Sequence, residues 1–137
     1  MKIILPVLLA LTCSAWAADP KTLAYGKYLV EEVGKCQECH TPRLENGQLD
    51  KEKWLKGAVL DFAPLHPMKD WHKTSPDITA SSRLWTKWGE ATFLKFMQTG
   101  LTPKGTPAAS PMPAYKLNAK DAEAILEFLK SLRLRSL

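Results

Sequence analysis

The sequence predicts a single, mainly helical domain of the all-α class. Three segments, 19–34, 89–100 and 118–132, carry apolar residues at helical spacing and capping residues at their ends. No segment shows a convincing strand pattern or an internal repeat, and a length of 137 residues fits one domain. Prolines are frequent in 41–77 and 101–113, so we expect long loops there.

The N-terminal segment, residues 1–17, has the pattern of a secretory signal peptide. Lys2 supplies a positive charge, an apolar run follows, and Ala15-Trp16-Ala17 forms a small-x-small cleavage site. The apolar run is too short to span a membrane. We therefore expect an exported protein whose single domain comprises residues 18–137.

The cysteine content limits how this domain can be stabilised. Cys13 lies in the expected signal peptide, and Thr12 before it is a poor fit to the small residue that lipoprotein processing prefers, which favours soluble export over a lipid anchor on Cys13. Removing Cys13 leaves 3 − 1 = 2 cysteines, Cys36 and Cys39. Because these two lie in one motif, we expect no structural disulfide, although small exported domains often need one.

The first predicted helix begins with Asp19 as N-cap and Pro20 in the first helical position. Gly34 is expected to end it in a left-handed conformation. Gly26, inside the helix, costs about 1 kcal/mol relative to alanine, which makes sense if another helix crosses close by. The apolar stripe comprises Leu23, Tyr25, Tyr28, Leu29, Val30 and Val33.

Directly after this helix comes Cys36-Gln37-Glu38-Cys39-His40, the Cys-x-x-Cys-His attachment pattern of a c-type haem. Two thiols at this spacing can reach the two vinyl groups on one porphyrin edge and form thioethers, and the adjacent imidazole then becomes the proximal iron ligand. The motif predicts one covalent haem c on Cys36 and Cys39, with His40 on the iron. His40 should donate its second ring N–H to a carbonyl or carboxylate.

Three alternatives compete with haem attachment: a dithiol redox pair, half of a zinc site, and chance occurrence of the pentapeptide. A dithiol redox pair would be expected within a thioredoxin-like βαβ pattern, which the surrounding sequence does not show. A zinc site would need four ligands, and no second cysteine pair exists, so His66 and His72 would have to complete it.

The segment 41–77 is expected to be irregular. Asn46-Gly47 indicates a turn, and 50–56 fits a short helix stopped by Gly57. A loop this apolar usually wraps around something, and a haem edge is a suitable object. Its large apolar residues, with the one that follows, are Trp54, Leu60, Phe62, Trp71 and Ile78.

Two further helices complete the predicted fold. The second covers 89–98 and closes at Thr99-Gly100. The third is capped by Asn118, with Asp121 in a capping-box position. Its buried stripe is Ala122, Ile125, Leu126, Leu129 and Leu132, and Lys130, Arg133 and Arg135 lie near its C-terminal end, where cations suit the helix dipole.

A second iron ligand is sought among methionines and histidines, since thioether with imidazole is the pairing of electron-transfer cytochromes. Met112 stands between two prolines in a loop joining two helices, and such bracing is useful if its sulfur must meet a metal. Met97 lies on an apolar helix face, where core packing explains it. Met68, His66 and His72 compete with Met112, and the proline bracket favours Met112.

The formal charge of +5 becomes +4 once Lys2 is removed with the signal peptide. A mild positive charge suits an acidic protein partner or an anionic surface, although a merely solvated basic surface explains it equally well. No dense Lys/Arg cluster indicates nucleic acid. No acid/base pair, nucleophile constellation or phosphate-binding loop is apparent, so we do not expect an enzyme.

The chain resembles the class I monohaem c-type cytochromes, most closely the exported bacterial ones that serve as partners or subunits of periplasmic dehydrogenases. The matching stretches occur in family order over nearly the whole of 18–137. They are Gly26-Lys27-Tyr28-Leu29-Val30, Cys36 to Pro42, Ser75-Pro76-Asp77-Ile78-Thr79, Trp88 with Phe93, Thr99-Gly100, Pro111-Met112-Pro113, and Asp121-Ala122 to Leu129.

The resemblance implies the cytochrome c fold, with terminal helices crossing near Gly26 and loops wrapped around one covalent haem. It also implies His40 and Met112 as axial ligands, and electron transfer between redox proteins in the periplasm, as a monomer or as a subunit of a dehydrogenase complex. The rival function is a haem-based sensor or small-molecule binder with an open or displaceable sixth position.

Two residues depart from the family pattern. Asp77 stands where relatives often have Asn, and Gln98 stands where they often have Arg, so Arg83 is the substitute candidate for a propionate contact. Candidate indole donors to the propionates, each equally explained as core, are Trp54, Trp71, Trp85 and Trp88.

Overall fold

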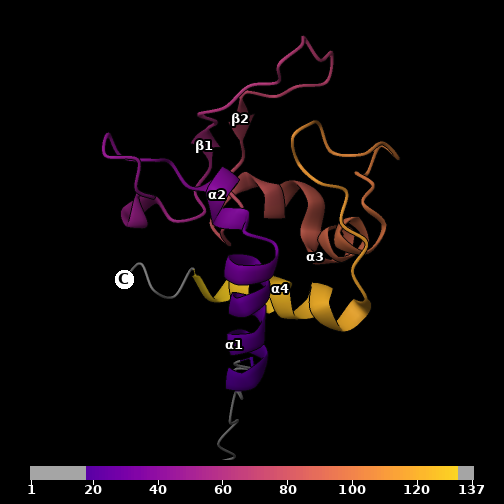
Figure 1. Ribbon diagram of the computed structural model, residues 1–137. Helices are drawn as coiled ribbons and strands as arrows, with labels where there is room; N and C mark the ends of the chain where they lie inside the picture. The colour runs from indigo at the N-terminus through magenta and orange to yellow at the C-terminus, as the bar shows by residue number, and fades with distance from the viewer. Residues whose placement is uncertain (1–17, 133–137) are drawn as a thin grey trace, which may run out of the picture.

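The computed structural model describes residues 18–132 (Figure 1). The expected signal peptide, with Cys13, and the cationic residues Arg133 and Arg135 lie outside the described residues. The helices are α1 (Pro20–Tyr28), η1 (Leu29–Val33), α2 (Cys36–His40), η2 (Lys51–Lys53), α3 (Arg83–Thr99) and α4 (Ala119–Ser131), and the strands are β1 (Ala58–Val59) and β2 (Thr74–Ser75).

The all-α prediction is confirmed, with one small addition. β1 and β2 form an antiparallel pair in which Ala58 faces Ser75 and Val59 faces Thr74. This two-residue ladder had no recognisable strand pattern in the sequence because it is too short to show alternation. Within residues 18–132, none of the helices combines the length and the apolar character needed to cross a membrane.

The first helix begins as predicted but ends differently. The Asp19 carboxylate accepts a hydrogen bond from the Thr22 backbone N–H at 3.1 Å. The last turn, η1, is a π-helix, closed by the Gly34 N–H donating to the Leu29 carbonyl at 2.7 Å. The prediction of a left-handed Gly34 is wrong: its φ is −79°, because that π-turn bond holds it in helical geometry, and Lys35 takes the left-handed conformation instead, with φ 47°.

The terminal helices cross at Gly26, as expected. Figure 1 shows α1 running across α4 at a steep angle. A Cβ atom on Gly26 would run into the backbone carbonyl of Ala124 and come within 2.8 Å of the Phe128 Cβ. Glycine is therefore required for the close approach of the two helices, and Val30 of η1 and Leu129 of α4 are both buried in the core.

The second predicted helix is longer than the sequence indicated. α3 begins at Arg83, where the Ser82 hydroxyl accepts from the Leu84 N–H at 3.1 Å. Gly89 interrupts it with φ 72° and ψ 169°, so the predicted start at Gly89 is a break between two helical segments. The end is as predicted, with Gly100 left-handed at φ 73°.

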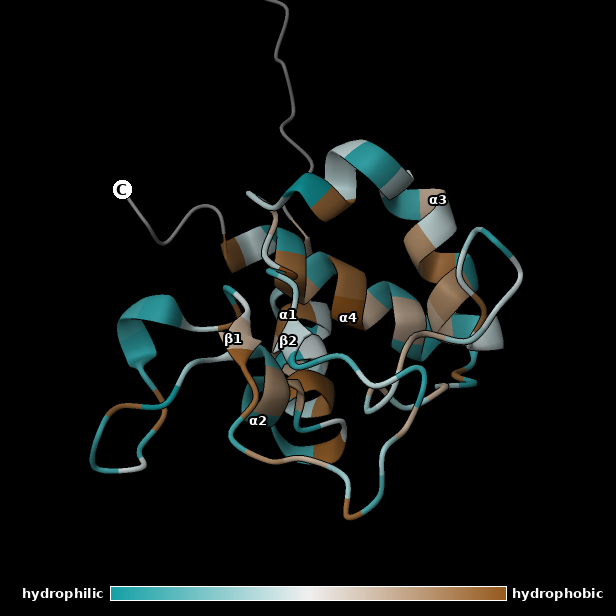
Figure 2. Cartoon of the chain, turned by 90° about the horizontal axis from the view of Figure 1, so that it is seen from above, coloured by the Kyte–Doolittle hydropathy of each residue, from teal (hydrophilic) through white to brown (hydrophobic). Residues whose placement is uncertain are grey.

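The last helix follows the prediction closely. The Asn118 side-chain oxygen accepts from the Asp121 N–H at 2.9 Å, which confirms the cap. Figure 2 shows apolar residues alternating with hydrophilic ones along α4, as expected of a helix with one buried side. Lys130 in the last turn pairs with Glu90 on α3 at 3.0 Å and with Glu127 at 3.1 Å.

The segment 41–77 only partly follows its prediction. The expected helix over 50–56 is reduced to the single turn η2, capped by the Asp50 carboxylate. Beyond β1 the chain leaves the body of the molecule as a protruding loop and returns at β2 (Figure 1). Leu65 on this loop is 98% exposed, and the loop between β1 and β2 extends outward from the body of the molecule.

Candidate functional site

A cavity of about 570 Å³ lies between α2, α3, α4 and the loop that joins the last two helices. Its volume is within the range of small-molecule and cofactor sites. The wall is mostly apolar. Its lining includes Cys36, Cys39, His40, Leu60, Phe62, His72, Pro76, Ile78, Leu84, Trp88, Phe93, Phe96, Met97, Pro111, Met112, Pro113, Tyr115, Ile125 and Leu129.

His40 is held on this wall through its ring. The Nδ1 atom lies 2.7 Å from the Pro76 carbonyl oxygen. A carbonyl oxygen can only accept, so Nδ1 carries the hydrogen and Nε2 keeps its lone pair. Burial lowers the pKa of His40, against the opposing effects of the Pro76 bond and Asp77, and so favours the neutral imidazole that a metal requires.

The Pro76 carbonyl is positioned by the strand pair. The Gly57 N–H donates to the His40 carbonyl at 2.8 Å, and the Ser75 hydroxyl donates to the Cys39 carbonyl. Gly57 has φ 87°, and a Cβ there would lie 2.8 Å from the Ser75 carbonyl oxygen and 2.9 Å from the Asp77 nitrogen. The short ladder between β1 and β2 therefore holds the segment that orients His40.

Cys36 and Cys39 both line the cavity from α2, one helical turn apart. The two cysteines form no disulfide with each other. Burial raises the pKa of Cys36 to about 11, and burial followed by the nearby Glu38 raises the pKa of Cys39, so both are protonated at neutral pH. With His40 on the same helix, the motif presents two thiols and one imidazole to one apolar space.

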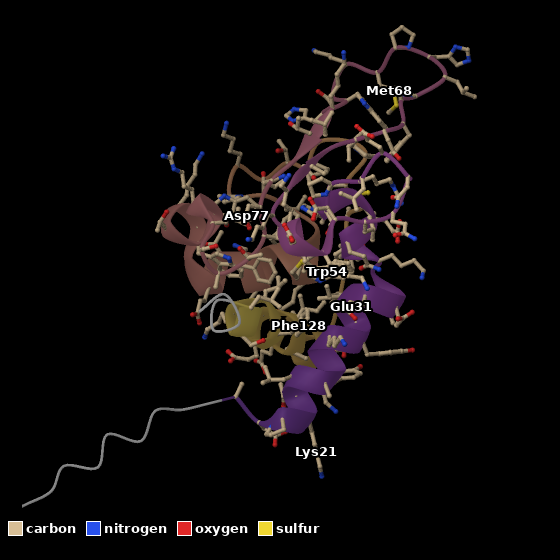
Figure 3. All side chains as sticks on the ribbon, turned by 90° about the vertical axis from the view of Figure 1, so that its left-hand side faces the viewer. Lys21, Glu31, Trp54, Met68, Asp77 and Phe128 are labelled. Carbon is tan, nitrogen blue, oxygen red and sulfur yellow. The ribbon has the colours of Figure 1, made fainter. Side chains whose placement is uncertain are left out.

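The candidates for the second ligand are separated by the structure. Met112 lines the cavity together with its flanking prolines, and Met97 and His72 also line it. His66 and Met68 are not part of the lining, and Met68, 50% exposed, lies near the outer end of the protruding loop (Figure 3). Met112, Met97 and His72 are thus the candidates for the second ligand that line the same cavity as His40.

His72 is attached to the segment that bears Met112. Its backbone N–H donates to the Ser110 carbonyl at 2.8 Å. Three residues near the base of the protruding loop, Leu60, Phe62 and His72, line the cavity. The structure therefore supports, for this part of the loop, the prediction that the loop lies against a bound group.

The tryptophans expected as indole donors differ in position. Trp85 donates to the Thr79 carbonyl at 2.6 Å and is not available to a bound group. Trp71 has a buried indole N–H without a partner among the described residues, although its ring is not part of the lining. Trp88 lines the cavity, and Trp54 packs against the core.

The two departures from the family pattern have different consequences. The Asp77 carboxylate accepts from both the backbone N–H and the hydroxyl of Thr79, each at 2.7 Å, and so stabilises the turn after Pro76. Gln98 and Arg83 are both exposed and neither lines the cavity. The zinc alternative gains no support, because residues 18–132 contain no group of three His, Cys, Asp or Glu side chains placed to hold a metal.

Two site residues were not identified as such from the sequence. Pro76 lies in the stretch Ser75-Pro76-Asp77, which matches the family pattern, and this match was the sequence signal for it. That its carbonyl accepts from His40 could not be read from the sequence, because the strand pair brings the two residues together. Tyr115 lines the cavity and donates its hydroxyl to the Gly34 carbonyl at 3.0 Å. Burial raises the pKa of Tyr115, so the hydroxyl remains a donor, and the only sequence signal was an aromatic residue near Met112.

Comparison with known proteins gives a consistent result. The model of the family described as "Cytochrome c" matches residues 23–133. A protein named diheme cytochrome c-type from Cereibacter sphaeroides is 33% identical over 110 residues, which cover 77% of this chain and 33% of the relative. A subunit of nicotinate dehydrogenase from Pseudomonas putida is 31% identical over 123 residues, covering 83% of this chain and 10% of the relative. The chain thus spans about a third and a tenth of these two proteins.

Proposed function

The chain belongs to the cytochrome c family, and we propose that it is a periplasmic monohaem electron carrier whose haem is bound through Cys36 and Cys39, with His40 and Met112 on the iron. Proteins of this family carry covalently attached haem c and transfer electrons. One haem is proposed because the sequence contains a single Cys-x-x-Cys-His motif.

The observation that carries the proposal is the meeting of four residues from two separate parts of the chain at one apolar cavity. Cys36, Cys39 and His40 come from α2, and Met112 comes from the loop before α4. The hydrogen bond from His40 Nδ1 to Pro76 leaves Nε2 as the nitrogen with a lone pair. The residues present therefore fit a haem c, which Cys36 and Cys39 would hold covalently and to whose iron His40 and Met112 would offer a nitrogen and a sulfur.

A haem c bound there supplies a one-electron couple at its iron, which needs no bond to a substrate. His40 gives a nitrogen donor whose tautomer and ring orientation are fixed by the Pro76 carbonyl. Met112 gives a soft sulfur donor that favours the reduced state and raises the potential. With a haem in place, the apolar lining would keep water away from the iron and so help to raise this potential.

Electron exchange with a dehydrogenase is the proposed physiological context. The similarity to the nicotinate dehydrogenase subunit supports it, because a chain of this kind can serve as the cytochrome part of a larger assembly. The charge of +4 after removal of Lys2 suits a partner with an acidic docking surface. Co-purification with a dehydrogenase after mild extraction distinguishes a complex subunit from a free monomeric shuttle.

The test of the proposal is the intact mass of the protein exported by a host with haem-attachment machinery. We expect the mass of residues 18–137 plus one haem, retained through acid–acetone extraction, and loss of that added mass in Cys36→Ala/Cys39→Ala. A haem that is extracted, or an unmodified polypeptide mass, contradicts the proposal. A five-coordinate ferrous spectrum would favour the sensor alternative with an open sixth position over the proposed six-coordinate carrier.

A further inference from the structure

The loop between α3 and α4 that carries Met112 is hydrogen-bonded to α3 near both of its ends. At its start, the Gly100 N–H donates to the Phe96 carbonyl at 2.7 Å. Near its end, the Leu117 N–H donates to the Met97 carbonyl at 3.0 Å. Between these points Met112 itself is held locally, by its N–H donating to the Ala109 carbonyl at 3.2 Å. These bonds fix the loop to α3, but none of them joins it to the attachment segment.

The connection to the attachment segment is made by Tyr115. Its hydroxyl donates to the Gly34 carbonyl at 3.0 Å, across 81 positions of sequence. Among residues 18–132, this is the only hydrogen bond between the loop 100–118 and the segment 34–40. Gly34 is followed by the left-handed Lys35 and then by Cys36, so Tyr115 reaches the chain where it turns into α2.

The packing around Gly34 leaves this bond little freedom. A Cβ atom on Gly34 would lie 3.3 Å from Cys36 Sγ and 3.5 Å from the Tyr115 hydroxyl oxygen. The tyrosine hydroxyl and the first cysteine sulfur therefore border the same small space. Tyr115 also lines the cavity, as Met112 and Cys36 do.

The backbone of Tyr115 is confined as well. A Cβ atom on Gly100 would lie 3.0 Å from the Tyr115 carbonyl oxygen and 2.9 Å from the Ala114 Cβ. The residue is thus packed against the end of α3 through its backbone and bonded to the segment before α2 through its side chain. A motion that carries the segment from Met112 to Tyr115 away from the cavity would therefore break the bond to Gly34.

We propose that Tyr115 is a positioning residue, whose hydroxyl ties the Met112 loop to the attachment segment and so keeps the Met112 sulfur on the iron. The inference rests on the proposed function, in which Met112 is the second ligand. A hydrogen bond of this kind contributes about two- to tenfold to an equilibrium. Its loss should raise the population of the open loop, and the rate at which the iron is reached from solution, by that factor.

The experiment compares Tyr115→Phe with wild type as haem-loaded proteins. Cyanide binding to the ferric protein reports the opening, because cyanide must replace the sixth ligand. We expect Tyr115→Phe to keep the near-red band of sulfur–iron ligation and to bind cyanide about two- to tenfold faster. The matched control is Tyr28→Phe, since Tyr28 is 53% exposed and its hydroxyl makes no hydrogen bond within the described residues. It should bind cyanide at the wild-type rate.

Two further measurements separate a positioning role from a general loss of stability. In the Met112→Ala background, removing the Tyr115 hydroxyl should change the cyanide rate no further, because the residue acts through Met112. The second measurement compares Tyr115→Phe with a core variant, such as Leu126→Val, that lowers the denaturation midpoint by the same amount. Cyanide binding should be faster in Tyr115→Phe than in this core variant.

The outcomes distinguish the two claims. A wild-type near-red band that is lost in Met112→Ala, together with an unchanged cyanide rate in Tyr115→Phe, overturns the role of Tyr115 and leaves the proposed function standing. A further acceleration in the double variant also overturns it. Absence of the near-red band from wild type, or its persistence in Met112→Ala, removes Met112 as ligand and overturns both.

Discussion

His40 depends on a carbonyl that lies 36 positions away in the sequence, at Pro76. The need for some acceptor could be predicted, because a histidine ligand usually donates its second ring nitrogen to a carbonyl or carboxylate. Which acceptor it is could not be predicted, since Pro76 is brought there by Gly57 and Ser75 through contacts between distant loops.

Gly57 gives this arrangement a specific test. Gly57→Ala should destabilise the protein by about 2–5 kcal/mol, because the left-handed backbone disfavours any side chain and the Cβ would strike the segment around Pro76. Chemical denaturation of the haem-loaded protein measures this. The matched control is Gly47→Ala, which has a similar φ of 80° but nothing within 4 Å, and should cost only about 1–2 kcal/mol. Equal losses in the two variants would contradict the packing role of Gly57.

The choice among the sulfur and nitrogen donors was partly accessible from the sequence. The proline bracket favoured Met112, which does line the cavity, and Met68 and His66 lie away from it. That His72 also reaches the cavity could not be predicted, because it follows from the bond between its backbone and Ser110. The identity of the second ligand itself stays a prediction.

At the scale of the elements, the predicted helix starts were reliable where a single capping residue determines them. Asp19 and Asn118 cap their helices as expected, because a cap is made by neighbours in sequence. The predicted left-handed conformation of Gly34 is wrong because the π-turn hydrogen bond holds Gly34 in helical geometry. The left-handed residue is the next one, Lys35. Gly89 was interpreted as a helix start, whereas it divides α3 into two parts.

The crossing of α1 and α4 allows a test in which two effects have opposite signs. Helix propensity alone predicts that Gly26→Ala stabilises α1 by about 1 kcal/mol. The structure predicts net destabilisation of about 1–3 kcal/mol, because the added methyl group meets the Ala124 backbone and the Phe128 side chain. The sign of the change in unfolding free energy decides between them, and a stabilised variant would contradict the close crossing.

At the scale of the whole molecule, the core and the cavity share side chains. Phe93, Phe96, Met97, Ile125 and Leu129 belong to the buried core and also line the cavity. A haem bound in the cavity would therefore pack against the same side chains that form the core. The sequence indicated a bound group in general terms, because the segment 41–77 is apolar but has no regular pattern. The outward course of the loop between β1 and β2 could not be predicted, because it depends on packing that no local pattern records.

The shared wall predicts that folding depends on the haem. Protein produced without haem attachment should be largely unfolded, because ligand binding stabilises only the folded state and these side chains would otherwise face water. Far-ultraviolet circular dichroism during heating measures this. A cooperative transition in the haem-free chain, with helicity equal to that of the haem-loaded protein, would show that the helices pack without it.

The net positive charge predicts a salt-dependent encounter with an acidic partner. Reduction by such a protein should slow as salt rises, because the Debye length falls from about 10 Å at 0.1 M to about 3 Å at 1 M. Stopped-flow mixing over this range measures the rate. A second-order rate constant that does not change with salt would indicate that the charge serves solubility and not docking.

The optical spectrum of the ferric protein tests the central claim, ligation of one covalent haem by His40 and Met112, most directly. We predict a weak near-red band from sulfur–iron ligation that Met112→Ala abolishes, with a lowered potential, and that Met68→Ala leaves intact because Met68 lies outside the cavity. Three results would contradict ligation by Met112. Loss of the band in Met68→Ala would move the second ligand to Met68, and survival of the band in both variants would move it to Met97. Absence of the band from the wild-type protein would move the ligand to His72.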